Sequence, residues 1–267
     1  MNFAKRCAEA AARTNSLLCV GLDPDPRDHP SAAAAERFCL DVLTATLPLA
    51  CAVKANAAYF EQFGATGLIV LERIRNYVPS DRLLILDAKR GDIGTSAQAY
   101  ARAAFDVIGA DAVTVNPLMG HDAVAPFLAR DGRGAFLLTR TSNPGAADLL
   151  DQPLASGEAL YLRIADLGIR WDPGGAVGFV VGATAVDAIA AIRSRTPDTP
   201  LLIPGVGAQG GSLEGAVAAG LDQEGAGLLI NVGRGIANAP EGYAGAAAAL
   251  RDRIETARMA VRAGWRG

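Results

Sequence analysis

Two lysines and two aspartates stand at spacings that could place alternating charges in one confined site. Three of them, Asp87, Lys89 and Asp92, lie in the segment DAKRGDIG. If residues 83–89 form a strand, side chains two apart share a face, so Asp87 and Lys89 point the same way. Lys54 lies in another apolar segment, VKAN, and could reach the same volume. Such an array keeps each lysine protonated and fixes ammonium groups where negative charge develops.

Two glycine-containing segments near the C-terminus predict a phosphate site. PGVGAQGG follows a predicted strand, and NVGRG ends the next one. The loops after the last two strands of a (β/α)8 barrel commonly bind phosphate through backbone N–H groups, and Arg234 could add a bidentate contact. A glycine turn alone also serves simply to allow a tight bend. A dinucleotide site is not expected, because the glycines do not follow the first strand.

Eight short apolar segments must position these residues, and amphipathic stretches alternate with them. Near-continuous apolar runs are typical of parallel strands buried on both faces; they span residues 17–23, 50–56, 83–89, 112–117, 134–140, 176–182, 201–207 and 228–234. The helical stretches include 31–47, 95–107, 156–169 and 185–194, and 1–14 indicates an extra helix before the first strand. The pattern predicts an α/β fold, a (β/α)8 TIM barrel with an extra N-terminal helix. A doubly wound open sheet is the main alternative. No linker divides the chain, so residues 1–267 are expected to form a single domain.

In such a barrel the active site lies at the carboxyl ends of the strands. The predicted strand ends carry Asp23, Lys54, Asp87, Lys89, Asn116, Arg140, Gly207 and Arg234. Internal salt bridges that merely fill the barrel are the alternative for any single charge pair. Asp23 could cap a turn or bind a ribose hydroxyl, and Ser142 could simply shape a turn. The stretch 141–154 has no predicted element, and a loop this long is more often functional than idle.

Composition limits the partners and cofactors. The chain of 267 residues has a formal net charge of −3 and a pI of about 5.5, which argues against a nucleic-acid-binding surface. Its four cysteines and two histidines lack metal-ligand spacing, so we expect no zinc site and reduced, buried thiols in a cytoplasmic protein. No apolar run approaches the roughly 20 residues of a membrane helix. The N-terminus lacks the apolar region of a signal peptide.

Taken together, the motifs resemble those of the orotidine 5′-phosphate decarboxylases. DAKRGDIG is similar to the D-x-K-x-x-D-I segment of that family. The segments GLDPDP, VKAN, RTSNPG, PGVGAQGG and NVGRG resemble its other motifs, from residue 21 to residue 236. The length of the chain and the residues of the DAKRGDIG segment are most similar to those of the longer bacterial subgroup, which includes mycobacterial enzymes. The resemblance implies a metal-free, cofactor-free decarboxylation of orotidine monophosphate to UMP in pyrimidine biosynthesis.

The resemblance also implies roles for individual residues. The charged catalytic tetrad would be Lys54, Asp87, Lys89 and Asp92, with Lys89 delivering a proton to C6. The last aspartate of the motif reaches the site of the partner subunit in this family, so Asp92, Ile93 and Ser96 are expected to act across a homodimer. Ser96 stands where many relatives carry threonine, a change that keeps the hydroxyl.

The same resemblance implies the contacts that hold the substrate. The pyrimidine would contact Ser142 and lie near Pro204, the ribose would contact Asp23, and the 5′-phosphate would be held by Gln209, Gly233 and Arg234. The roles of Asn116, Arg140 and Asn143 stay open at this point.

Three other activities fit parts of the sequence. A sugar-phosphate aldolase or decarboxylase of the same superfamily also carries D-x-K-x-x-D and is expected to use Mg²⁺ with extra carboxylate ligands. Here Ile85 is apolar, and Lys54 adds a cation where a metal is unfavourable. A non-catalytic nucleotide-binding protein would not need four charges. An isomerase of another phosphorylated metabolite would need a base outside the lysine pairing, and none stands out.

Overall fold

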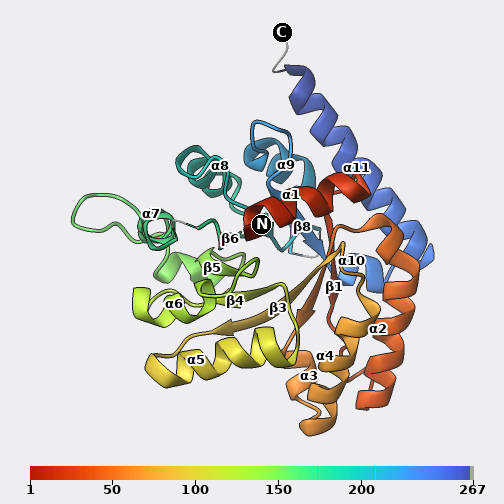
Figure 1. The fold of residues 1–267 in the computed structure, drawn as a ribbon. Helices are drawn as coiled ribbons and strands as arrows, with labels where there is room; N and C mark the ends of the chain where they lie inside the picture. The colour runs from red at the N-terminus through yellow and green to blue at the C-terminus, as the bar shows by residue number, and fades with distance from the viewer. Residues whose placement is uncertain (173, 208, 265–267) are drawn as a thin grey trace.

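The eight predicted strands form one closed parallel barrel (Figure 1). The structure is a computed structural model that describes residues 1–172, 174–207 and 209–264. The strands follow the chain order around the barrel, and β1 pairs with β8 to close it, so the open-sheet alternative is wrong. They are β1 Leu18–Leu22, β2 Ala52–Asn56, β3 Leu83–Arg90, β4 Ala112–Val115, β5 Gly134–Arg140, β6 Val177–Val181, β7 Leu201–Ile203 and β8 Leu228–Val232.

Helices surround the barrel and connect successive strands (Figure 1). They are α1 Phe3–Thr14, α2 Ala32–Thr46, α3 Ala58–Glu61, α4 Ala65–Tyr77, α5 Gly94–Arg102, α6 His121–Leu128, α7 Leu160–Trp171, α8 Val186–Arg195, α9 Leu213–Gly220, α10 Arg234–Ala237 and α11 Gly242–Gly264. Within the part of the chain that the structure describes, no helix combines the length and apolar composition needed to cross a membrane.

Two helix predictions need adjustment at their ends. The helix predicted at 95–107 is α5, which continues as a π-helical turn over Ala103–Val107. The helix predicted from residue 156 begins only at Leu160, because a short bridge joins Pro153 to Ala159 in the preceding loop. The stretch at 141–154 contains one 3-10 turn, Pro144–Asp148, and otherwise runs as the predicted loop.

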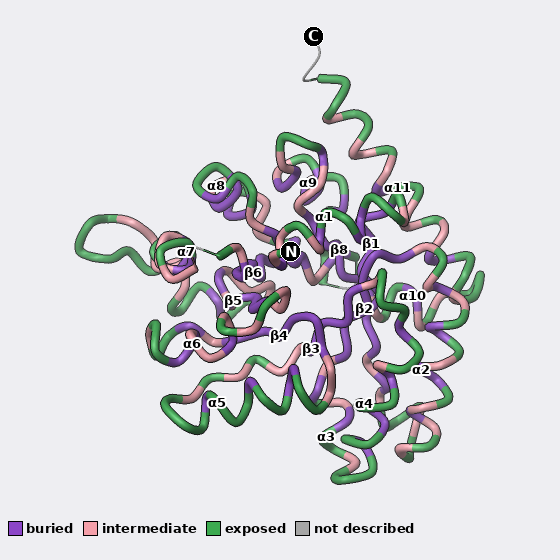
Figure 2. Tube along the Cα trace, viewed as in Figure 1, coloured by how far each residue is buried: buried purple, intermediate pink, exposed green. Residues whose placement is uncertain are grey.

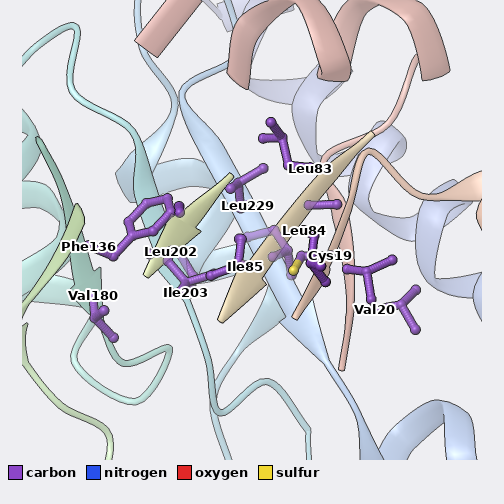
Figure 3. Packing of buried hydrophobic residues seen from close by; sticks show 14 of the residues in the cluster. Cys19, Val20, Leu83, Leu84, Ile85, Phe136, Val180, Leu202, Ile203 and Leu229 are labelled. Atoms are coloured by element: carbon purple, nitrogen blue, oxygen red, sulfur yellow. The ribbon is translucent and has the colours of Figure 1, made fainter. Parts of the chain in front are cut away.

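The strands supply the core of the molecule. Every residue of β1, β6 and β8 is buried, and in Figure 2 the buried colour follows the strands while the helices are exposed on their outer faces. Figure 3 shows side chains of this cluster, among them Ile85, Leu202 and Leu229 from three different strands. Burial on both faces explains why the strand segments are apolar without alternation.

Helix α1 closes the amino-terminal end of the barrel. Phe3 is buried and packs edge-on against Phe136, with ring centroids 5.5 Å apart. It occupies the space beside Gly134, where a Cβ atom would lie only 2.1 Å from the Phe3 ring. The backbone N–H of Ala4 donates to the carbonyl of Gly175 at 3.1 Å. The predicted extra helix is therefore part of the barrel structure.

A buried carboxylate joins several segments at the same end. Asp111 Oδ1 accepts from Arg6 Nη2 at 2.7 Å and from Arg133 Nη1 at 2.8 Å. Its Oδ2 accepts from Arg75 Nη1 at 2.8 Å and from the backbone N–H of Leu84 at 2.9 Å. This Asp111 cluster links α1, α4, β3 and the residue before β5, so segments far apart in the sequence depend on one side chain.

Replacing Asp111 should destabilise the fold without touching the carboxyl ends of the strands. The variant Asp111→Ala leaves three guanidinium groups without their shared carboxylate, and we expect it to lose about 3 kcal/mol of unfolding free energy. Urea denaturation at equilibrium measures the loss. Asp131→Ala, at an exposed carboxylate of the same end, serves as the control. Equal urea midpoints for the two variants would contradict the role given to the cluster.

Candidate active site

A cavity of about 500 Å³ opens at the carboxyl ends of the strands. Its wall brings together nine of the twelve residues predicted for the site: Asp23, Lys54, Asp87, Lys89, Ser142, Pro204, Gln209, Gly233 and Arg234. These residues come from both halves of the sequence and meet only because the barrel closes. The cavity is large enough for a small phosphorylated molecule.

Asp87 binds both lysines of the predicted array. Lys54 Nζ lies 2.6 Å from Asp87 Oδ2, and Lys89 Nζ lies 2.6 Å from Asp87 Oδ1. Neighbouring strands deliver these groups, because Asn56 of β2 is paired with Asp87 of β3. The Lys54 side chain is 5% exposed, whereas that of Lys89 is 51% exposed. One ammonium group is therefore sealed into the barrel and the other faces the cavity.

The pairing decides the charge state of this lysine–aspartate array (Lys54, Asp87 and Lys89). Burial alone would lower the pKa of Lys54, but the carboxylates of Asp87 and Asp23 outweigh it, so the pKa is raised. Burial would likewise raise the pKa of Asp87, yet Lys54 and Lys89 hold that pKa well below its usual range. Lys54 is thus an ammonium and Asp87 a carboxylate at neutral pH.

Lys89 reaches its position through an irregularity in β3 that strand periodicity does not predict. The β3–β4 register shifts between Leu86 and Arg90, and Lys89 has a left-handed backbone with φ 48°. Its N–H donates to Thr114 Oγ1 at 2.9 Å. The prediction that Asp87 and Lys89 converge is confirmed, but the straight strand assumed for it is wrong, because the chain bulges between them.

Asp23 follows β1 and points a partly unmet carboxylate into the cavity. Among the described residues its Oδ1 atom is buried without a hydrogen-bond partner. Burial raises the pKa of Asp23, and the neighbouring Lys54 opposes that rise. Glycine is needed beside it, since a Cβ on Gly233 would lie 2.8 Å from Asp23 Oδ2. A buried acceptor of this kind is suited to a hydroxyl donor on a ligand.

The residues predicted to hold phosphate follow β7 and β8, and they line the cavity. They are Gln209, Gly233 and Arg234. In the described part of the chain Arg234 pairs with no carboxylate, so its guanidinium is available to an anion. The glycine-rich turn begins at Gly205, whose φ of 93° is one that glycine adopts without strain. Residue 208 of this turn lies outside the described residues.

Three predicted residues do not line this cavity. Asp92, Ile93 and Ser96 follow β3, and Asp92 Oδ1 accepts from the N–H of Ile93 at 2.8 Å. The Ile93 side chain is exposed, with 56% of its surface accessible, and Ser96 is exposed as well. Their expected action across a homodimer stays a prediction.

The residues whose roles the sequence left open differ from one another. Asn116 accepts from the N–H of Leu118 at 3.0 Å and shapes a turn after β4. Arg140 forms two hydrogen bonds to Asp151, at 2.6 and 2.9 Å, and so fixes the loop after β5. Neither lines the cavity, nor does Gly207, whereas Asn143 does.

Sequence reasoning missed several cavity residues, of which Thr114 has the most contacts in the array. Its hydroxyl donates to Asp87 Oδ1 at 2.9 Å. The signal was present, since Thr114 is the one polar residue inside the apolar strand AVTV. Tyr59 and Asn231 also line the cavity. Asn231 carries the same signal as Thr114, because it is the one polar residue of the strand LLINV, whereas nothing in the sequence context of Tyr59 distinguishes it from a packing residue.

The fold and the site define a (β/α)8-barrel enzyme that acts with charged side chains on a phosphorylated small molecule. Residues 16–249 match the orotidine 5′-phosphate decarboxylase / HUMPS family, and the chain belongs to that family. This confirms the resemblance inferred from DAKRGDIG and PGVGAQGG.

Individual relatives match this chain along nearly their whole length. Orotidine 5′-phosphate decarboxylase of Roseiflexus sp. (strain RS-1) is 47% identical over 272 residues, which are 97% of this chain and 100% of that protein. The protein of the same name from Thermomicrobium roseum is 44% identical over 98% of each chain. Among solved structures, OMP decarboxylase of Leishmania donovani is 41% identical, with a TM-score of 0.90 over 97% of this chain and 100% of that one.

Removing the central carboxylate should change the titration of Lys54. In Asp87→Asn the carboxylate that opposes the effect of burial on Lys54 is lost. We therefore expect the pKa of Lys54 to fall below its ordinary value of 10.5. The folded variant then binds fewer protons than its unfolded chain, and its stability rises with pH toward that value. In the wild type the raised pKa gives stability that is present below the ordinary lysine pKa and is lost above it. NMR titration of ¹³C-labelled lysine and urea unfolding at several pH values measure both effects.

The control for this experiment is Asp106→Asn, which breaks an exposed ion pair with Arg130. Exposed pairs contribute little to stability, so neither the Lys54 titration nor the pH dependence should change. A Lys54 pKa that stays raised in Asp87→Asn would contradict the electrostatic account of the array.

Proposed function

We propose that the chain removes CO2 from orotidine 5′-phosphate and releases UMP, as a carboxy-lyase of pyrimidine biosynthesis. The observation that carries this function is the lysine–aspartate array, which projects the ammonium group of Lys89 into a cavity that Arg234 also lines. Relatives 44–48% identical over nearly the full length bear the name of this activity.

The cavity residues suggest how the substrate is oriented. Gln209, Gly233 and Arg234 would hold the 5′-phosphate, and Asp23 would accept a hydrogen bond from a ribose hydroxyl, which satisfies its unmet Oδ1. Ser142 and Pro204 would contact the pyrimidine. In this proposed orientation the bond to be broken is directed toward Lys89.

Lys89 can supply both the charge and the proton that the chemical step needs. When the C6–carboxylate bond breaks, CO2 leaves and the electron pair stays on C6. The ammonium group of Lys89 stabilises this charge and transfers a proton to C6, which leaves a neutral lysine that regains its proton from solvent. Lys54 stays protonated against Asp87 and keeps that carboxylate charged and fixed.

Phosphate is remote from the bond that breaks, yet it can contribute to the rate. Binding energy at a distant group can hold the reacting centre in position, so substrates that lack phosphate lose kcat/KM and not only affinity.

We further propose that the active site is completed in a homodimer, with Asp92, Ile93 and Ser96 reaching the cavity of the partner. Ile93 and Ser96 are exposed outside their own cavity, which supports this arrangement. Large apolar side chains lie exposed in the neighbouring loop, Leu118 at 53% and Met119 at 45%. Exposed large apolar side chains that stand next to one another are a feature of interaction surfaces.

A Mg²⁺-dependent reaction on a sugar phosphate is the alternative within this superfamily. Such chemistry needs several carboxylate ligands close together. Here Ile85 is buried and apolar, and both oxygens of Asp87 are bound by lysines. The described residues contain no group of three or more His, Cys, Asp or Glu side chains arranged to bind a metal. The donor set thus favours decarboxylation.

The setting that we propose is one domain that acts in the cytoplasm without nucleic acid. All four cysteines are buried free thiols, as predicted, which suits a reducing compartment. The net charge of −3 is unfavourable for binding a polyanion.

The direct test follows the ultraviolet absorbance of orotidine monophosphate with purified protein in EDTA. We expect rapid loss of the orotate absorbance, and a decrease of about a thousandfold or more in kcat for Lys89→Ala, because stabilisation and proton transfer are lost together. Lys5→Ala, an exposed lysine of α1, should behave as wild type. No turnover by folded wild-type protein would refute the function, and turnover restored only by Mg²⁺ would favour the sugar-phosphate class.

Mixing two inactive variants tests whether sites are shared between subunits. Lys89→Ala and Asp92→Ala lie in different halves of one shared site, so a mixed dimer contains one intact site. Activity should recover after the variants are unfolded and refolded together, toward about a quarter of wild type if subunits pair at random. If Asp92 acts in its own subunit, the mixture stays as inactive as its components.

A further inference from the structure

Thr114 occupies a central position beneath the cavity although it carries no charge. It lies within β4 and is 1% exposed. Its hydroxyl accepts from the backbone N–H of Lys89 at 2.9 Å and donates to Asp87 Oδ1 at 2.9 Å. A hydroxyl has one hydrogen, and an ionised carboxylate can only accept, so the direction of both hydrogen bonds is fixed.

The bulge in β3 explains why a side chain is needed at this point. Regular pairing between β3 and β4 stops at Leu86 and resumes at Arg90, so the N–H of Lys89 has no ladder carbonyl opposite it. The backbone of Lys89 is also left-handed, a conformation that residues with a Cβ atom rarely adopt. The hydroxyl of Thr114 supplies the missing acceptor and so stabilises the bulged backbone.

We propose that Thr114 is a positioning residue for the decarboxylation, which holds Lys89 at both ends. It binds the main chain of Lys89 directly, and it binds the carboxylate that receives the Lys89 ammonium group. The proposal rests on the function proposed above. It assigns to an uncharged strand residue the task of fixing where the proton donor stands.

Positioning matters here because Lys89 is the less buried of the two lysines. Its side chain is 51% exposed, against 5% for Lys54. A lysine has a flexible four-carbon stem, and displacing a catalytic group by about 1 Å can lower the rate about a hundredfold. Asp87 Oδ1 accepts from Lys89 Nζ and Thr114 Oγ1 together, so loss of the hydroxyl frees the carboxylate oxygen that directs the ammonium group.

The test compares Thr114→Val, which keeps the shape and removes the hydroxyl, with Thr114→Ser, which keeps the hydroxyl. We expect Thr114→Val to lower kcat for orotidine monophosphate about 10- to 100-fold while the Kd for UMP changes less than about twofold. Thr114→Ser should restore most of kcat. Amide exchange at Lys89 should become faster in the valine variant alone, because its N–H has lost its acceptor.

Thr139→Val is the matched control. Thr139 is a buried threonine of the next strand, β5, and its hydroxyl donates only to the nearby carbonyl of Leu137 at 2.9 Å. This variant should keep wild-type kcat. If Thr139→Val loses as much kcat as Thr114→Val, the effect is general to buried threonines and the proposal is wrong.

Other outcomes also decide the question. Unchanged kcat in Thr114→Val, or a serine variant no better than the valine variant, would overturn the proposal. If Thr114→Val does not fold, Thr114→Cys takes its place, since a thiol of similar size is a weak partner and should still lower kcat. An inactive wild type would instead refute the proposed function, and amide exchange at Lys89 would then still test the contact with Thr114.

Discussion

Asp87 accepts an ammonium group on each of its two carboxylate oxygens, and its own side chain is only 11% exposed. Charges in such a place are unfavourable unless each has its partner. Side chains from three neighbouring strands must therefore lie in contact with one another. They are Lys54 from β2, Asp87 and Lys89 from β3, and Thr114 from β4. A barrel whose neighbouring strands are locked in register meets this requirement, since small errors in one strand would leave a buried charge unpaired.

The opposite end of the barrel provides the stability that this site lacks. There the Asp111 cluster satisfies a buried carboxylate with three arginines, and α1 seals the core with Phe3. At the carboxyl end, by contrast, Asp23 keeps a buried oxygen without a partner among the described residues, and Lys89 has a left-handed backbone. Unmet acceptors and strained residues persist only where the surrounding structure is firmly held. The two ends thus divide stability and chemistry between them.

The sequence was informative wherever charge interrupts an apolar pattern. The sequence singles out Lys54, Asp87 and Lys89 because a charged residue is costly to bury in an apolar strand unless it has a partner. The bulge that sets Lys89 was not predictable, since it depends on pairing with β4 and leaves no mark on the order of apolar residues. Thr114 escaped notice for a related reason, because threonine is common in strands whether or not its hydroxyl is used. Asn116 and Arg140 also lie at strand ends, but neither lines the cavity. Asn116 accepts a hydrogen bond from Leu118, and Arg140 donates to Asp151.

The environments of the two lysines assign them different tasks. Lys54 is buried, and the carboxylates around it raise its pKa, so it stays protonated at neutral pH. Lys89 shares Asp87 with it but has half of its side chain exposed to the cavity. An ammonium group that transfers a proton must reach the reacting atom and must regain a proton from solvent afterwards. Of the two lysines only Lys89 meets both conditions, which supports its proposed role as proton donor, and Lys54 is then the fixed charge that keeps Asp87 ionised.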